Sequence, residues 1–119
     1  MTTSLAEFKK AVRRLEEALA KPKDEFLRDS VIQRFELSIE LAWKTAKKVM
    51  GTNRSAPKLV VREMAENGLI ENVELWLQSV DMRNLSTHTY REDLAEKVYG
   101  FAKAFLPELK DLLPKLEAK

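Results

Sequence analysis

The longest series of apolar side chains at helical spacing lies between about Asp24 and Met50. Its members are Leu27, Val31, Phe35, Ile39, Ala42, Trp43, Ala46 and Val49. Residues three or four positions apart fall on one face of an α-helix, because each residue turns the helix by about 100°. The series therefore predicts one long amphipathic helix, and Gly51 is a suitable residue for its end.

Shorter helical segments flank this one. Ser4, with a glutamate three residues later, forms a capping box, so a first helix is expected to begin at Ser4 and to end before Pro22. A third helix is predicted from near Ser55, with a proline in its first turn, to the Asn-Gly pair that ends at Gly68. It should bury Leu59 among other apolar residues.

Two more helices are predicted in the second half. A short one should run from about Asn72 through Val80. Thr89 and Glu92 have the spacing of a second capping box, so a final helix is expected to start close to Tyr90. The boundary between these two helices should therefore fall just before Tyr90.

The chain contains no segment that alternates apolar and polar residues as a strand does. Pro107 and Pro114 are expected to kink or interrupt the tail, although each also fits the first turn of a renewed helix. With 119 residues, only 3 glycines and 45% hydrophobic residues, the sequence favours one all-α domain over residues 1–119. We expect an antiparallel up-and-down bundle, with a four-helix core and a short extra helix, and with Trp43 and Trp76 packed in that core.

Composition excludes several kinds of site. There is no cysteine and a single histidine, so a disulfide framework, a thiolate metal site or a histidine-based zinc site is not expected, and no cofactor is predicted. The first ten residues lack the apolar centre of a signal peptide, and no window approaches the roughly 18 apolar residues of a membrane span. We expect a cytoplasmic protein without a membrane partner.

Charge is unevenly distributed although the net charge is only +2. Residues 41–62 contain six basic residues and no acid, whereas residues 63–81 contain five acids and no base. The basic residues are Lys44, Lys47, Lys48, Arg54, Lys58 and Arg62. Two interpretations stay open: the basic segment faces phosphates, or these charges complement helix dipoles.

The stretch RNLSTHTY contains the only histidine, His88, between Arg83 and Tyr90. In one unbroken helix, residues five apart point about 140° away from each other. A helix boundary just after His88 would instead let Arg83, His88 and Tyr90 converge on one groove. A histidine titrates near neutral pH and a guanidinium binds phosphate, so this set suits metal-free cleavage of RNA, with Asn84 orienting the substrate or His88.

Ordinary alternatives exist for each of these residues. A histidine in a loop is often simply solvated or caps a helix. Asp81 is expected to form a local ion pair with Arg83. Glu36 and Glu40 are expected to form a solvated carboxylate stripe, with Lys44 four residues after Glu40.

Three stretches of the chain resemble the HEPN superfamily. They are IQRFELSIELAWKTAKKVM, APKLVVREMAENGLI and DMRNLSTHTY. The similarity is to its branch of nucleotidyltransferase substrate-binding proteins and covers about Leu5 to Leu116. The most diagnostic pattern is arginine, a polar residue, three further residues, histidine, one residue and tyrosine. This chain fills every position of that pattern, from Arg83 to Tyr90.

The resemblance implies a helical homodimer that brings two motifs together across a cleft. It implies a metal-independent endoribonuclease toxin with Arg83 and His88 as the catalytic pair and Asn84 in support. It also implies a separate minimal nucleotidyltransferase that silences the toxin by transferring a nucleotide to Tyr90. The alternatives are a non-catalytic subunit that binds nucleotide or substrate for the transferase, and a purely structural dimerisation module. The chain has no Gly-Ser pair with spaced aspartates, so it is not itself the transferase.

Overall fold

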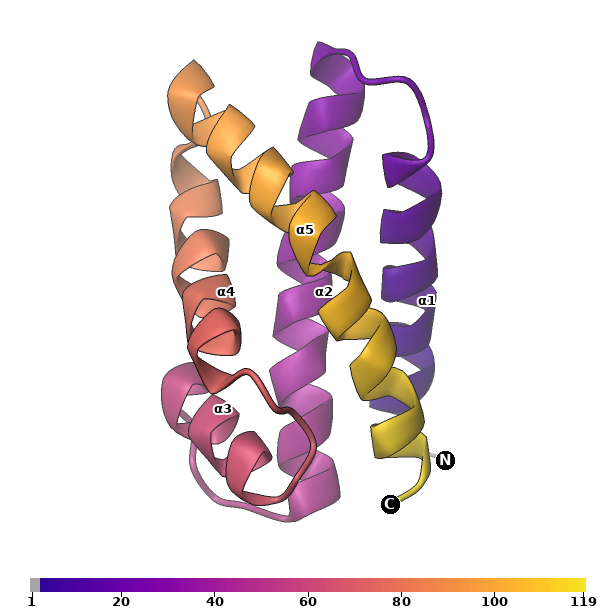
Figure 1. Cartoon of the computed structure of the whole chain (residues 1–119), viewed down its shortest axis with the longest axis vertical. Coiled ribbons are helices and arrows are strands. Elements are labelled where there is room, and N and C mark those ends of the chain that lie inside the picture. Colours follow the sequence, from indigo (N-terminus) through magenta and orange to yellow (C-terminus); the bar gives the residue numbers. More distant parts are fainter. Residues whose placement is uncertain (1–2) are drawn as a thin grey trace.

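The computed structural model describes residues 3–119 and, within that range, contains helices and no strand (Figure 1). The elements are α1 (Thr3–Leu19), α2 (Glu25–Met50), α3 (Pro57–Glu66), α4 (Val73–Leu85), the 3₁₀ turn η1 (Ser86–His88) and α5 (Glu92–Glu117). The predicted all-α class is confirmed. No helix among the described residues has the length and hydropathy that a membrane crossing requires.

The helices alternate in direction, as the ribbon of Figure 1 shows. α1 runs up, α2 down, α4 up and α5 down across the other helices, while the short α3 sits at one end between α2 and α4. α2 is the central element, because it contacts α1, α3, α4, η1 and α5. The predicted up-and-down bundle with a short extra helix is therefore confirmed, although the short helix is α3 and not the segment that begins near Asn72.

Apolar side chains from all five α-helices of the described chain form one continuous core. Trp76 of α4 is only 1% exposed, and its ring packs edge-on against Phe105 of α5 with the centroids 4.7 Å apart. Trp43 of α2, in contrast, is partly exposed and only borders this core. Burying a large apolar side chain contributes about 1.5–3 kcal/mol, so Trp76 is a main source of stability and Trp43 a lesser one. Leu59, which was expected to be buried, is 45% exposed.

Some of the observed helix ends match those predicted from the sequence, and others do not. The Asp24 carboxylate accepts a 2.7 Å hydrogen bond from the amide of Leu27, and Gly51 has a φ of 68° after the last turn of α2. Only a residue without a Cβ adopts that φ readily, so Gly51 ends α2 as expected. The predicted cap at Ser4 is wrong, because α1 already begins at Thr3 and the Ser4 hydroxyl instead contacts Lys48 Nζ at 2.6 Å. α3 begins two residues later than expected.

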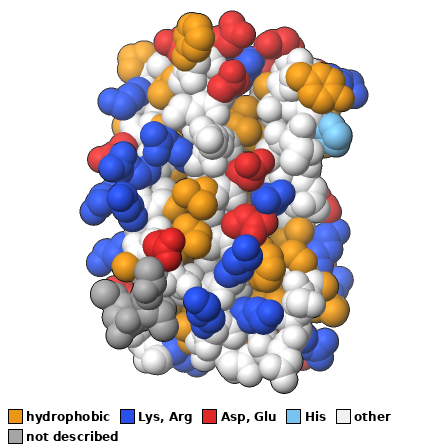
Figure 2. Space-filling view, turned by 180° about the vertical axis from the view of Figure 1, so that it is seen from behind, with side chains coloured by type: hydrophobic (Ala, Val, Ile, Leu, Met, Phe, Trp, Pro, Cys, Tyr) orange, Lys and Arg blue, Asp and Glu red, His pale blue; other side chains and the backbone are white. Residues whose placement is uncertain are grey.

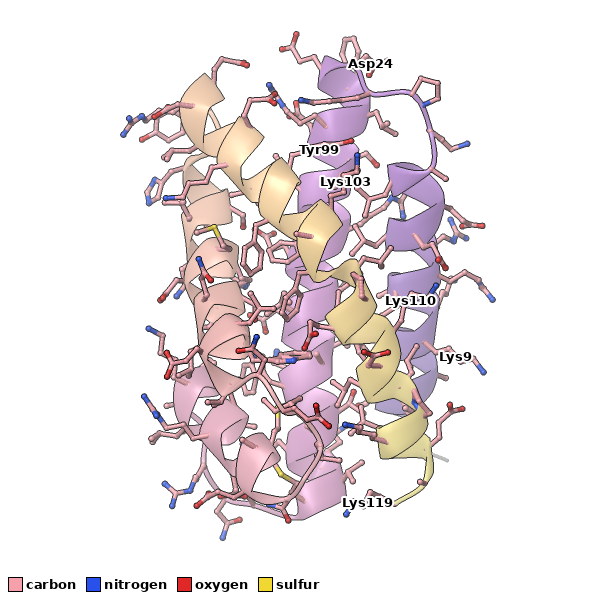
Figure 3. The ribbon with its side chains drawn as sticks, viewed as in Figure 1. Lys9, Asp24, Tyr99, Lys103, Lys110 and Lys119 are labelled. Atoms are coloured by element: carbon pink, nitrogen blue, oxygen red, sulfur yellow. The ribbon has the colours of Figure 1, made fainter. Side chains whose placement is uncertain are left out.

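α5 continues through both of its prolines without interruption. Each proline lacks the N–H that would bond the carbonyl four residues earlier, and these carbonyls belong to Lys103 and Lys110. Both lysines and both prolines are exposed; Figure 3 labels the two lysines on α5. Water can bond the freed carbonyls on this side, which explains why the predicted break at Pro107 and Pro114 does not occur.

Candidate functional site

The motif lies where α4 passes through η1 into α5. Arg83 is in the last turn of α4, His88 closes η1, and Tyr90 lies between η1 and α5. The predicted helix boundary after His88 is therefore present, but the predicted capping box is wrong. The Thr89 hydroxyl donates to the carbonyl of Ser86 at 3.2 Å, and α5 begins only at Glu92 without a side-chain cap.

His88 and Tyr90 are both at the surface, and the chain's one histidine is the pale blue side chain of Figure 2. Their ring centroids lie 6.1 Å apart at an interplanar angle of 77°, in edge-to-face contact. The Tyr90 side chain is 81% exposed. No hydrogen bond or ion pair to the His88 side chain occurs among residues 3–119. Both groups are therefore accessible to a molecule that approaches from solvent.

Arg83 occupies a different environment, because its side chain is only 28% exposed. Its Nε atom lies 2.9 Å from Oε1 of Glu40 on α2, an ion pair in which the N–H does not point at the oxygen. An open groove of about 420 Å³ borders this pair. The groove is lined by Gln33, Arg34, Glu36, Leu37, Glu40 and Arg83.

Within one chain the motif is thus divided into two parts. Arg83 lines the groove, while His88 and Tyr90 are not among its lining residues. Asn84 is exposed on the last turn of α4, and its carbonyl accepts a 3.0 Å hydrogen bond from the Thr87 hydroxyl. The structure therefore brings His88 and Tyr90 together, but it does not gather all three motif side chains in a single groove.

Sequence reasoning missed the role of two acidic residues on α2. Glu40 pairs with Arg83, and the Glu36 carboxylate accepts a short hydrogen bond from the hydroxyl of Ser86. The expectation of a solvated stripe is wrong for both residues, although the ion pair of Glu40 with Lys44 is present at 3.2 Å. Their spacing of four residues indicated that both lie on one side of a long helix. It did not indicate that this side of α2 faces α4 and η1.

The expected ion pair between Asp81 and Arg83 is also not formed. Asp81 Oδ1 instead lies 2.7 Å from Nζ of Lys58 on α3. Residues two apart on a helix point about 160° away from each other, which separates Asp81 from Arg83 and turns it towards α3. The acid that pairs with Arg83 is Glu40, from a different helix.

A buried arginine lies next to the motif. Arg28 of α2 is 5% exposed, and its Nη1 lies 2.6 Å from Glu92 and 3.1 Å from Glu96 in the first two turns of α5. Hydrogen bonding from Arg28 lowers the pKa of Glu92 below its ordinary value of 4.5. For Glu96, hydrogen bonds from Lys23 and then from Arg28 lower the pKa in the same way. The arginine therefore holds two charged carboxylates at the start of α5.

Most of the basic residues between 44 and 62 contact other side chains of the bundle. Lys44, Arg54 and Lys58 each form an ion pair with an acidic side chain, and Lys48 bonds the Ser4 hydroxyl. Two lysines lie in the last turn of α2, where a positive charge is favourable. The position of these two lysines agrees with the second interpretation, in which charges complement helix dipoles, whereas the ion pairs of Lys44, Arg54 and Lys58 belong to neither interpretation. Metal-ligand clusters of three or more His, Cys, Asp or Glu side chains are absent from the described residues.

Fold and site together define a small all-helical bundle that presents an arginine, a histidine and a tyrosine at one helix junction. A family model described as nucleotidyltransferase substrate binding protein like matches residues 3–118. The chain belongs to this family, and the predicted membership is confirmed.

Relatives with known structure or curated names agree with this assignment. A Haemophilus influenzae protein named probable ribonuclease HepT is 32% identical over an alignment of 96 residues, which covers 74% of this chain and 66%, just under two thirds, of that protein. A crystal structure of a Thermus thermophilus protein matches with a TM-score of 0.84 and 32% identity, and covers 92% of this chain and 98% of that one. A further Haemophilus influenzae structure, described as the fold of a substrate binding domain of a nucleotidyltransferase, matches with a TM-score of 0.85 at 28% identity, over 95% of this chain and 98% of that one.

Proposed function

We propose that this protein is a HEPN-type, metal-independent endoribonuclease toxin that a separate minimal nucleotidyltransferase controls through Tyr90. One domain over residues 1–119 carries the activity, although residues 1–2 lie outside the described part. The observation that carries the proposal is the exposed His88 imidazole, which has no polar partner among the described side chains and sits five residues after an arginine. The name of the HepT relative supports the same activity.

The proposed reaction is an attack of an RNA 2′-hydroxyl on its own phosphodiester. His88 accepts the proton of the 2′-hydroxyl while O2′ forms a bond to phosphorus and the bond from phosphorus to O5′ breaks. A proton from an imidazolium then reaches the leaving O5′ and yields a 2′,3′-cyclic phosphate and a 5′-hydroxyl. Arg83 stabilises the charge on the non-bridging oxygens, and Asn84 orients the substrate or His88. The reaction therefore needs no metal from the protein.

Dimerisation would unite the two parts of the site. Leu37, which is 53% exposed, belongs both to the groove beside Arg83 and to a second groove of about 370 Å³ between α1 and α2. This face contains exposed apolar surface together with both signs of charge, as a surface that pairs with its own copy about a two-fold axis requires. In the proposed homodimer, two such faces meet and place the motif of one chain opposite that of its partner.

Tyr90 is the proposed point of control. Its phenol is 81% exposed, as a substrate for a second protein must be. Nucleotide transfer would put a bulky anion beside His88, whose ring lies 6.1 Å from that of Tyr90, and the anion would compete with RNA for Arg83. The proposed outcome is a silenced toxin.

The test is reconstitution with the partner transferase and a labelled nucleoside triphosphate. Intact-mass measurement should give a nucleotide-sized increment on the wild-type chain and none on Tyr90→Phe, and RNA cleavage should cease only for the modified wild type. Modification at another residue, or cleavage that persists after stoichiometric modification, would refute the proposed control.

The second candidate is a non-catalytic subunit that binds a nucleotide or substrate for the transferase. It is favoured by the description of the Haemophilus influenzae structure as a substrate binding domain. It predicts nucleotide binding that is lost in Arg83→Ala, with no RNA cleavage at any concentration of protein. Titration calorimetry with a nucleoside triphosphate, run beside a cleavage assay, separates the two functions.

A further inference from the structure

One contact holds the start of the turn that carries His88. Ser86 is the first residue of η1 and is 6% exposed. Its hydroxyl donates to the carboxylate of Glu36, which comes from the central helix α2. The same hydroxyl lies within hydrogen-bond distance of the Arg83 carbonyl in the last turn of α4. A side chain of α2 is therefore tied to the point where α4 ends and the turn begins.

A second contact holds the segment just after the turn. Glu92 is the first residue of α5. The preceding residue, Arg91, is at the N-cap position, but its side chain does not cap the helix. Arg28 of α2 instead bonds Glu92 at 2.6 Å and Glu96 at 3.1 Å. Because Arg28 is buried, its charge needs these carboxylates, and the start of α5 is fixed against α2.

Between these two contacts, the polar side chains of residues 87–91 bond only to residues a few positions away in the chain. The hydroxyls of Thr87 and Thr89 donate to carbonyls of α4 and η1, and Arg91 pairs with the nearby Asp93. His88 and Tyr90 contact each other and are exposed. Among the described hydrogen bonds and ion pairs, none from residues 87–91 reaches α2, so Glu36 and Arg28 are the flanking polar anchors.

The two anchors share one rigid support. They lie eight residues apart on α2, which corresponds to about 12 Å along a helix axis. Positions separated by four and eight residues remain on one side of a helix. α2 therefore fixes the distance between the two ends of the segment from Ser86 to Glu92, and it contacts both ends from the same side.

We infer that Glu36 and Arg28 are positioning residues that hold the His88–Tyr90 turn at its two ends and so fix the directions of the imidazole and the phenol. The structural part of this inference stands on the contacts alone, whereas its effect on catalysis rests on the proposed ribonuclease function. Neither side chain is placed in contact with RNA.

The experiment measures backbone amide hydrogen exchange of residues 87–91 and RNA cleavage in the same set of full-length variants. Glu36→Ala and Arg28→Met remove the anchors, while Glu36→Gln and Arg28→Lys keep an acceptor or a cation. Glu16→Ala is the matched control, because Glu16 pairs with Lys110 at 2.6 Å across α1 and α5, away from the turn. Amides of α1 report whether the bundle stays folded.

Loss of either anchor should speed exchange at residues 87–91 by about tenfold or more while α1 stays protected. Cleavage should fall by about tenfold to a hundredfold, because small displacements of reacting groups are costly. The conservative variants should recover most of both signals, and Glu16→Ala should change neither. If Arg28→Met does not fold, Glu36→Ala decides alone, since Glu36 is only partly buried.

Unchanged exchange at residues 87–91 in Glu36→Ala would overturn the inference. Faster exchange with undiminished cleavage would overturn it as well, because the turn would then not need its anchors for catalysis. A wild-type protein that cuts no RNA would instead refute the proposed function, and the exchange measurement would still decide whether the anchors hold the turn.

Discussion

Glu40 Oε1 lies 2.9 Å from Nε of Arg83, while Oε2 of the same carboxylate lies 3.2 Å from Nζ of Lys44. The carboxylate is thus held by a lysine of its own helix and in turn holds an arginine of α4. Its closest contact with Arg83 is through Nε. The two terminal nitrogens of a guanidinium form the fork that binds two phosphate oxygens at once, and this contact through Nε leaves that fork for a substrate.

Glu40→Gln should therefore lower both kcat and KM for RNA cleavage. Removing the negative charge from the groove strengthens binding of a polyanion, whereas the loss of the ion pair leaves Arg83 less well oriented in the transition state. We expect kcat to fall by about tenfold. Steady-state kinetics on a short RNA check this, with Glu16→Gln as a control whose two constants should match the wild type. A Glu40→Gln enzyme with unaltered kcat would show that the ion pair does not orient Arg83.

The two tryptophans should differ sharply in their contribution to stability. Trp76 is 1% exposed and packs on Phe105, so Trp76→Ala should lower the free energy of unfolding by about 3–5 kcal/mol. Trp43 is partly exposed, and Trp43→Ala should cost less than about 2 kcal/mol. Urea denaturation followed by circular dichroism measures both values. Equal losses for the two variants would contradict the packing described above.

Acid should weaken the contact between α2 and the start of α5. The pKa values of Glu92 and Glu96 lie below 4.5 in the folded protein, so these groups bind fewer protons when folded than when unfolded in that range. Their contribution to stability is present above about pH 4.5 and is lost as the pH falls through the lowered folded values. We therefore expect Tm to drop below about pH 4.5 more steeply in the wild type than in Arg28→Met.

The pH prediction has a specific control. Lys110 pairs with Glu16 between α5 and α1, and none of the described hydrogen bonds or ion pairs joins either residue to Arg28, Glu92 or Glu96. Lys110→Met should therefore keep the wild-type slope of Tm against pH. An Arg28→Met protein with the same slope as the wild type would show that the buried arginine is not the source of the acid sensitivity.

Tyr90→Phe should separate modification from folding. The phenol is 81% exposed and none of the described polar groups bonds it, so the free energy of unfolding should change by no more than about 0.5 kcal/mol. RNA cleavage should persist, while nucleotide transfer by the partner enzyme should be abolished. Loss of cleavage in Tyr90→Phe would assign the phenol a part in the reaction itself.

Much of the bundle was predictable from local patterns. The series from Leu27 to Val49 defined α2, and Asp24 and Gly51 marked its ends, because apolar spacing and capping act over a few residues. The start of α5 was predicted too early. The Thr89 hydroxyl bonds the Ser86 carbonyl of η1 and does not cap α5, which begins only at Glu92. The predicted interruption at the two prolines was wrong, because the effect of a proline depends on which side of α5 faces solvent.

The candidate site was predictable only as a motif. Arg83, His88 and Tyr90 were identified by residue type and spacing, and the junction after His88 was expected. The contacts from Glu36, Glu40 and Arg28 were not expected, because a pairing between residues more than forty positions apart depends on how the helices are arranged. These are the contacts that set the geometry of the motif.

The most direct test of the proposed function is cleavage of RNA by the purified protein in EDTA, wild type beside His88→Ala. His88 is exposed, so its substitution should leave the bundle folded, which circular dichroism verifies. We predict fragments with 2′,3′-cyclic phosphate ends from the wild type and a loss of at least about a hundredfold in rate for His88→Ala. Equal cleavage by both proteins, or none by unmodified wild type, would contradict the assignment of this protein as a ribonuclease that uses His88.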